Sequence, residues 1–191
     1  MNIAPPAEGV PPGCRMQSFR LRHSEVDRTG TVTLRTIFDH AQEAAANHAA
    51  ELGVGMAYLA ARCQGWMLSR IRFSFLRPLP TLGSMIAVET YPIGFHRRLF
   101  ALREFIFRDA AGNIWAVGSS WWILVALGRL RPLELPAALA ADLPDNSARR
   151  RFFPELEKFV PPAGEILWRH VVPESGIDVN GHWNNAEYAA L

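Results

Sequence analysis

The stretch "TLRTIFDHAQEAAANHAAELGV", residues 33–54, decides the fold because it carries the clearest helical pattern in the chain. Side chains of one face recur at helical spacing, at Ile37, Phe38, Ala41, Ala44, Ala45, His48, Ala49 and Leu52. Gly53 follows them and suits the end of a helix. The alanines of this face are small, so the helix can lie close to a sheet. The pattern therefore predicts one long helix with its inner face on β-structure.

Strand patterns surround this helix, one before it and four after it. They cover Met16–Leu21 and residues 65–79, 83–92, 97–109 and 114–127, the third of these five ending at Pro92. Ile71, Phe73 and Phe75 alternate with arginines, as expected of a strand with one buried face. The "AAGN" of residues 110–113 is expected to close a hairpin between the last two strands. This element order predicts an α+β hotdog fold, in which an antiparallel sheet wraps round the long helix.

Composition and charge argue against several classes of function. The 191 residues carry a formal net charge of only +2, which argues against a dedicated nucleic-acid binder. Cys14 and Cys63 are far apart and lack metal-ligand spacing, so we expect reduced thiols, no disulfide and no metal site. We also expect no cofactor.

The sequence lacks the patterns of export and membrane insertion. Its opening, "MNIAPPAEGVPPG", has neither a basic start nor an apolar core, so no signal peptide is expected. The most apolar run, residues 114–128, is interrupted by Gly118 and two serines and is shorter than the roughly 20 residues that span a bilayer. A buried strand explains it better, and we expect a cytoplasmic protein without a membrane span.

A dense cluster of polar side chains, "GIDVNGHWNNAEY" at residues 176–188, lies close to the end of the sequence. It matches an earlier stretch. "HSEVDRTGTVT" aligns with "ESGIDVNGHWN" when Asp27 is placed on Asp178, 151 positions later, and Gly30 then meets Gly181. Both stretches follow a strand pattern and precede a helix pattern. We interpret them as two copies of one structural unit, the second ending as its central helix begins.

The repeat, and the loss of periodicity between its copies, give the expected domain boundaries. They are a flexible leader at residues 1–15, an N-terminal hotdog domain at 16–136, a linker rich in proline and charge at 137–164, and the truncated start of a C-terminal hotdog domain at 165–191. A half-formed second unit would leave a strand edge without a partner. The chain is therefore expected to associate with another copy as a homodimer, or to be a fragment of a longer protein.

These stretches resemble the acyl-acyl carrier protein (acyl-ACP) thioesterases of plant plastids and bacteria, a family of tandem double hotdogs. The resemblance covers nearly all of the chain after the first fifteen residues. It includes a D-R-T turn before a helix with Q-E-x-A and N-H, a strand with W-x-x-x-R, and an S-x-W strand that leads to R-x-P. The most specific part is "IDVNGHWNNAEY", residues 177–188, which is similar to the family's active-site signature D-x-N-x-H-x-N-N-x-x-Y.

The resemblance implies hydrolysis of acyl-ACP to free fatty acid in fatty acid biosynthesis, with the acyl chain on the phosphopantetheine of the carrier protein. The family's catalytic residues match Asp178, Asn180 and His182, and its structural polar positions match Asn184, Asn185 and Tyr188. Two features depart from the family. Pro173 and Gly176 stand where a charged residue is frequent, and the family's further catalytic acid or cysteine would lie beyond Leu191.

Asp178, Asn180 and His182 alternate, so in an extended segment their side chains would share one face. A carboxylate beside an imidazole raises its basicity, and we expect Asp178 to attack or orient, Asn180 to position it and His182 to activate water. The alternative is that such side chains cap a helix or hold a turn. We favour that alternative for Asn184 and Asn185.

An acyl chain also needs an apolar slot. Candidates for its lining are Met56, Trp66, Met67, Phe73, Phe75, Trp121 and Trp122; the expected substrate-binding residues are Trp66, Met67, Phe73, Trp121 and Asn184. Plain core packing explains each apolar residue at least as well. His40 and His48 are expected to be core or surface histidines. The arginines within residues 95–98 and 149–151 would either attract an acidic carrier protein or form a solvated face.

Two other functions remain open from the sequence alone. One is acyl-CoA hydrolysis by a hotdog thioesterase. The other is a catalytically inactive acyl-binding or dimerisation module, because the second hotdog is incomplete.

Overall fold

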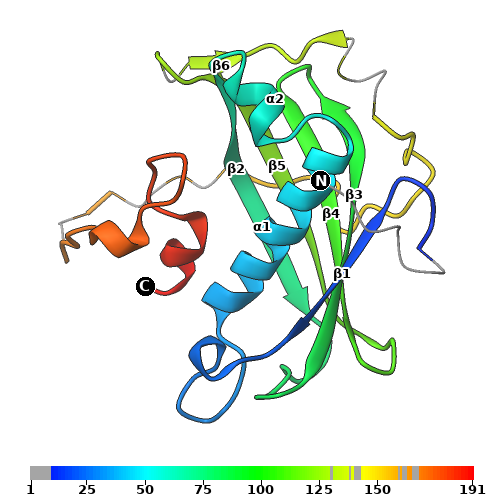
Figure 1. Ribbon diagram of the computed structural model, residues 1–191, viewed down its shortest axis with the longest axis vertical. Coiled ribbons are helices and arrows are strands. Elements are labelled where there is room, and N and C mark those ends of the chain that lie inside the picture. Colours follow the sequence, from blue (N-terminus) through cyan, green and yellow to red (C-terminus); the bar gives the residue numbers. More distant parts are fainter. Residues whose placement is uncertain are drawn as a thin grey trace.

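One long helix lies across a curved antiparallel sheet (Figure 1). The computed structural model describes residues 10–129, 131–137, 139, 143–158, 160, 163–164 and 168–191. The helix is α1, Leu34–Glu51. The strands are β1 (Arg15–Arg20), β2 (Gln64–Phe75), β3 (Met85–His96), β4 (Phe100–Asp109), β5 (Ile114–Ala126) and β6 (Arg131–Leu133). Their order is β1-β3-β4-β5-β2, with β6 paired to β5.

The predicted α+β hotdog fold is confirmed, and the long helix and the five strands expected around it are found within a few residues of their predicted ends. Two short elements were missed, the helix α2 (Met56–Ala60) and the strand β6. Strand β3 also continues beyond Pro92, because a bulge between Pro92 and Gly94 accommodates the missing N–H of the proline.

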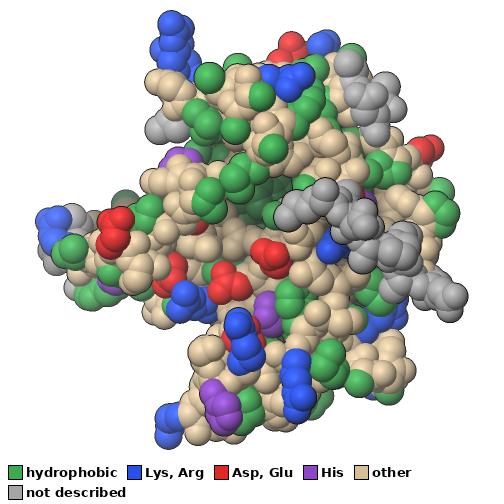
Figure 2. Space-filling view, in the orientation of Figure 1, with side chains coloured by type: hydrophobic (Ala, Val, Ile, Leu, Met, Phe, Trp, Pro, Cys, Tyr) green, Lys and Arg blue, Asp and Glu red, His purple; other side chains and the backbone are tan. Residues whose placement is uncertain are grey.

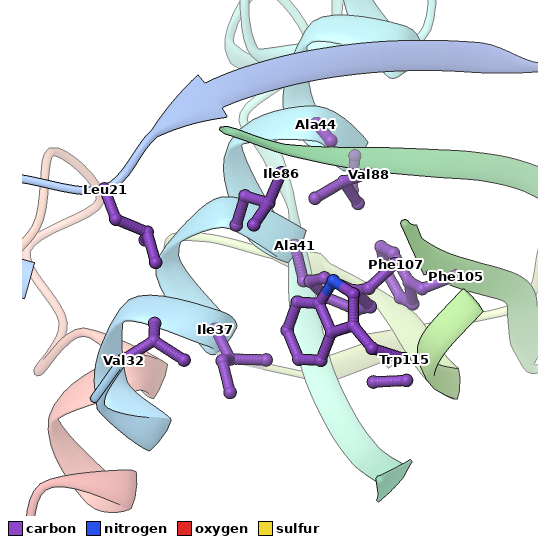
Figure 3. Close-up of a cluster of buried hydrophobic side chains, with 12 residues drawn as sticks. Leu21, Val32, Ile37, Ala41, Ala44, Ile86, Val88, Phe105, Phe107 and Trp115 are labelled. Atoms are coloured by element: carbon purple, nitrogen blue, oxygen red, sulfur yellow. The ribbon is translucent and has the colours of Figure 1, made fainter. Parts of the chain in front are cut away.

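The main core lies between α1 and the sheet (Figure 3). Ile37, Ala41 and Ala44 of α1 are completely buried, and they face Ile86, Val88, Phe105, Phe107 and Trp115 of the sheet. The small alanines allow this close approach. Gly118 likewise leaves room for the Phe73 ring on the neighbouring strand, because a Cβ at residue 118 would lie 2.3 Å from Cδ1 of Phe73. The helix begins at a cap, where Oγ1 of Thr33 accepts a hydrogen bond from N of Thr36 at 3.2 Å.

The other face of the sheet is covered by residues 143–158, which we call the strap. Side chains of a strand alternate between faces, so Glu104 points away from α1 while its neighbour Arg103 points toward it. The Glu104 carboxylate accepts hydrogen bonds from Oγ of Ser119 and from the backbone N of Phe152 in the strap, the latter at 3.1 Å. Leu156 of the strap is 5% exposed. The sequence suggested a linker here, and the structure shows a segment packed along the sheet.

The most apolar run of the sequence forms β5, which is hydrogen-bonded to β2 and β4 along most of its length. In the ranges that the structure describes, no helix has both the length and the apolar character needed to cross a bilayer.

Residues 168–191 form a small separate unit beside α1 (orange to red in Figure 1). It contains two 3₁₀-helices, η2 (Glu174–Gly176) and η3 (Asn185–Ala189). The strand expected at its start is not found in residues 168–173, and residues 165–167 lie outside the described ranges. The Trp183 ring stacks on His170 at a ring centroid distance of 5.1 Å and also contacts the tilted ring of Tyr188 at 4.3 Å. Gly176 leaves room for it, since a Cβ there would lie 3.0 Å from Nε1 of Trp183.

The two copies of the sequence repeat have the same local structure. Each has a 3₁₀-helix, His23–Glu25 or η2, followed by an isolated β-bridge, Val26 to Val32 or Ile177 to Trp183. In the first turn, N of Asp27 donates to O of Thr31 at 2.8 Å. In the second, N of Asp178 donates to O of His182 at 2.8 Å. Gly30 and Gly181 have φ values of +80° and +73°, the left-handed region that favours glycine. The two stretches thus share one turn structure, and the interpretation of the second as the start of another hotdog domain stays a prediction.

Candidate functional site

The predicted catalytic residues lie on a tight turn that is organised by the Asp178 carboxylate. Its Oδ1 accepts hydrogen bonds from the backbone N of Asn180 at 2.8 Å and of His182 at 3.2 Å. Its Oδ2 lies 3.4 Å from Nδ2 of Asn180. The expectation of an extended segment was wrong, because the backbone reverses at Gly181. The turn gathers the three residues around one carboxylate. The hydrogen bond from His182 to this carboxylate comes from its backbone N–H and not from its imidazole ring.

The first copy shows what this aspartate does for the backbone. Oδ1 of Asp27 accepts hydrogen bonds from N of Thr29 at 2.8 Å and from N of Thr31 at 3.1 Å, the same pattern as in the second copy. Threonines occupy the places of Asn180 and His182. The aspartate therefore shapes the turn in both copies, and only the second copy carries an amide and an imidazole.

A pair of amide hydrogen bonds holds the second unit on α1. Nε2 of Gln42 donates to Oδ1 of Asn184 at 3.0 Å, and Nδ2 of Asn185 donates to Oε1 of Gln42 at 2.8 Å. Oδ1 of Asn184 also accepts from the backbone N of Ala186 at 2.9 Å, so Asn184 caps η3 as the sequence suggested. An ion pair between Arg35 and Glu187, at 2.8 Å, adds to this contact.

A cavity of about 1200 Å³ begins beside this turn and extends between α1 and the sheet. Figure 2 shows the hollow, with hydrophobic side chains on its floor and acidic side chains near its rim. Of the residues expected to bind or react, those that line it are Asp178, Asn180, His182, Asn184, Trp66 and Met67, and the further candidates Met56 and Trp122 also line it. One continuous space thus connects the polar turn with an apolar interior.

Phe73 and Trp121 lie away from this cavity, although both were expected to bind substrate. Phe73 points to the inner face near the start of α1, where its ring packs edge-on against Phe38 at 5.1 Å. Trp121 is 3% exposed on the outer face, in a cluster with Leu102 and Leu156. Its neighbour Trp122 faces the cavity instead, because adjacent residues of a strand point to opposite faces. Phe75 does not line the cavity and is exposed.

Sequence reasoning missed a buried arginine on the cavity wall. Arg103 is 9% exposed, and its Nη1 donates to Nδ1 of His48 at 3.1 Å and to Oγ1 of Thr90 at 3.2 Å. Burial lowers the pKa of Arg103 to about 10, so it stays charged at neutral pH. Burial and the Arg103 charge lower the pKa of His48 to about 3, which leaves its ring neutral. The sequence did contain a sign of this residue, because Arg103 occupies alternate positions with Phe105 and Phe107 and so falls on the face of the strand that points to the core.

A second histidine is buried near the start of α1. His40 is 6% exposed, stacks on Phe19 at 4.0 Å and lies 3.3 Å from Oε1 of Glu25. Burial lowers the pKa of His40, and the hydrogen bond from Arg22 is the main cause that lowers the pKa of Glu25 to about 2. His40 and His48 are therefore both core histidines.

The two cysteines lie apart, Cys14 buried and Cys63 exposed. Cys14 and Cys63 are free thiols, as expected. Among the residues that the structure describes, no group of three or more His, Cys, Asp or Glu side chains is placed to hold a metal ion.

Known proteins resemble this chain in sequence and in structure. Residues 14–143 match the family described as the acyl-ACP thioesterase N-terminal domain. The chain is 23% identical over 184 residues to a chloroplastic palmitoyl-acyl carrier protein thioesterase of Gossypium hirsutum, covering 90% of this chain and 44% of that protein. It is 26% identical over 187 residues to a chloroplastic dodecanoyl-[acyl-carrier-protein] hydrolase of Umbellularia californica, covering 91% and 48%.

A crystal structure of an acyl-ACP thioesterase from Bacteroides thetaiotaomicron has the same fold, with a TM-score of 0.81 at 23% identity over 93% of this chain and 71% of that chain. The chain spans less than half the length of the two curated relatives. The matched residues 14–143 contain the whole sheet and α1, together with much of the cavity wall. Through this N-terminal domain, the chain belongs to the acyl-ACP thioesterase family.

Proposed function

We propose that the protein acts in the hydrolysis of acyl-ACP thioesters, which releases a free fatty acid and the carrier protein. One observation carries the proposal: the polar turn at Asp178–His182 and the apolar residues beneath α1 line the same cavity. A thioester lying at the turn would have its carbonyl carbon near the imidazole and its acyl chain in the apolar part. Family membership supports the same reaction.

The reaction uses His182 as the general base. Its imidazole takes a proton from water, and the resulting hydroxide attacks the thioester carbonyl carbon. The tetrahedral intermediate then breaks its carbon–sulfur bond, and the imidazolium returns the proton to the departing thiolate. Asp178 orients the turn, because its carboxylate binds the backbone of Asn180 and His182. Asn180 lies against the second carboxylate oxygen and keeps it in place.

The proposed carrier is the phosphopantetheine of an acyl carrier protein, and coenzyme A presents the same thiol end. Arg97 and Arg98 are exposed on the turn between β3 and β4, where an acidic partner has access to them. Arg98 already pairs with Glu134 at 2.8 Å, so Arg97 is the stronger candidate for such a contact.

The test compares His182→Ala with His23→Ala, an exposed histidine in the first copy of the repeat. Acyl-ACP and acyl-CoA substrates of several chain lengths are supplied, and circular dichroism confirms that each variant is folded. We expect His182→Ala to lower kcat by at least about 100-fold and His23→Ala to leave it unchanged. Equal turnover in the two variants contradicts the assignment. A wild-type chain that binds these thioesters without hydrolysing them supports the inactive acyl-binding module instead.

A further inference from the structure

The amide hydrogen bonds between α1 and the second unit run in one direction. Asn185 donates to Gln42, and Gln42 donates to Asn184. Oδ1 of Asn184 therefore receives two donors, Nε2 of Gln42 at 3.0 Å and the backbone N of Ala186 at 2.9 Å. Rotating the Asn184 amide by half a turn would place its NH₂ group against both donors. Its orientation is thus fixed, with Nδ2 on the side away from them.

The Nδ2 group of Asn184 is the free end of this series. It donates to none of the described residues, while Asn184 is half-buried and lines the cavity beside the catalytic turn. The first copy has no such group, because Thr33 stands at the place of Asn184 and its hydroxyl is engaged with Thr36 at the start of α1. The second copy therefore adds an oriented pair of N–H donors at the cavity wall.

We propose that Nδ2 of Asn184 donates a hydrogen bond to the thioester carbonyl oxygen, and that Gln42 is a positioning residue that aims it. This inference rests on the proposed function. A carbonyl oxygen gains negative charge as water attacks, and a donor that is already oriented stabilises that charge without having to reorganise. Asn184 is then a catalytic residue on the second unit, and Gln42 acts on the reaction from helix α1.

Three variants separate this role from simple docking of the second unit. Asn184→Ala removes the donor, and Gln42→Met removes the group that orients it. Arg35→Met is the matched control, because it breaks a different polar contact between α1 and the second unit, the ion pair to Glu187. We expect kcat to fall about 100-fold in Asn184→Ala and at least tenfold in Gln42→Met, with KM changed less than threefold. Arg35→Met should change kcat less than threefold, since the Arg35 side chain is 52% exposed and an ion pair with such a partner contributes little.

Gln42→Glu adds a readout that a purely structural role would not produce. An ionised carboxylate would face Oδ1 of Asn184 with no proton to donate, whereas the protonated carboxyl group would donate as the amide does. Relative to wild type, kcat of this variant should therefore rise as the pH falls below the pKa of the new carboxyl group. A wild-type pH profile in Gln42→Glu, or wild-type kcat in Gln42→Met, overturns the inference.

A binding measurement keeps this inference distinct from the proposed function. The probe is a ketone analogue of an acyl-pantetheine, in which CH₂ replaces the sulfur, so that it offers a carbonyl group but cannot be hydrolysed. We expect the probe to shift the side-chain ¹H–¹⁵N resonances of Asn184 in wild type and not in Gln42→Met. If the wild-type chain hydrolyses no thioester, the proposed function fails, and this spectrum alone then decides whether Asn184 binds the carbonyl group. A bound probe that leaves the Asn184 resonances unchanged overturns the role of Asn184.

Discussion

At the scale of single residues, Asp178 and its first-copy counterpart Asp27 accept the same backbone hydrogen bonds, but only the turn of Asp178 carries a histidine. Asp27 takes the same backbone hydrogen bonds without a neighbouring imidazole, so shaping the turn does not require chemistry. Asp178 shapes its own turn in the same way. The negative charge of Asp178 could also act on the reaction, beyond the hydrogen bonds that its oxygen atoms accept.

Asp178→Asn tests this, because an asparagine oxygen can accept the same two backbone hydrogen bonds. We expect the Asn variant to keep kcat within about tenfold of wild type and the Ala variant to lose at least about 100-fold, as the turn loses its shape. Steady-state kinetics of both variants provide the measurement. Asp27→Ala is the control, which should lower the melting temperature and leave kcat unaffected. If Asp178→Asn is as inactive as Asp178→Ala, the carboxylate itself reacts with the substrate.

At the scale of elements, the strap is held on the sheet by a buried acid. Glu104 is 1% exposed, and its carboxylate accepts hydrogen bonds from Ser119 and from the backbone of Phe152. Burial raises the pKa of Glu104 from 4.5 to about 6, although these two hydrogen bonds oppose the shift. The contribution of Glu104 to the stability of the fold therefore depends on pH in a defined direction.

The folded state retains the Glu104 proton at pH values where the unfolded chain has already released it. The contribution of Glu104 to the free energy of unfolding therefore falls as the pH rises from 4.5 through about 6, by about 2 kcal/mol in total. Urea denaturation at a series of pH values measures this slope. Glu104→Gln should abolish it, while Glu157→Gln, an exposed acid of the strap, should leave it intact. An unchanged slope in Glu104→Gln would show that another group titrates.

The elements also show what the sequence could and could not predict. The helix and the main strands follow from local periodicity, and each was found. The sequence pattern did not show whether Trp121 or Trp122 faces the cavity. A shift of one position moves a side chain to the opposite face of the sheet, and the strand pairing sets this position. The strap has no periodicity of its own, because its hydrogen bonds go to Glu104 and other residues far away in the chain. Likewise, the contacts of Gln42 join residues more than 140 positions apart.

At the scale of the whole molecule, stability and the candidate site are divided between the two units. The four apolar core clusters draw their members from residues 10–156, and none comes from the second unit. The polar residues proposed for catalysis all lie in the second unit, and the cavity proposed for the acyl chain is lined mainly by the first. The domain boundary near residue 165 remains a prediction that this division supports.

Truncating the chain after Gly164 tests the division. We expect the remaining protein to keep its sheet and helix signals in circular dichroism, because its core is intact. It loses the Gln42 and Arg35 contacts, which are partly exposed and contribute about 1 kcal/mol each, so the melting temperature should fall by about 5 °C. Thioesterase activity should disappear. A truncated chain that fails to fold cooperatively contradicts the boundary.

The repeated turn has an evolutionary consequence. One aspartate, one left-handed glycine and a few peptide bonds are enough to reproduce its shape, so the positions between them are free to change. Mutation at those positions can therefore add or remove reactive groups in one copy without disturbing the architecture of either.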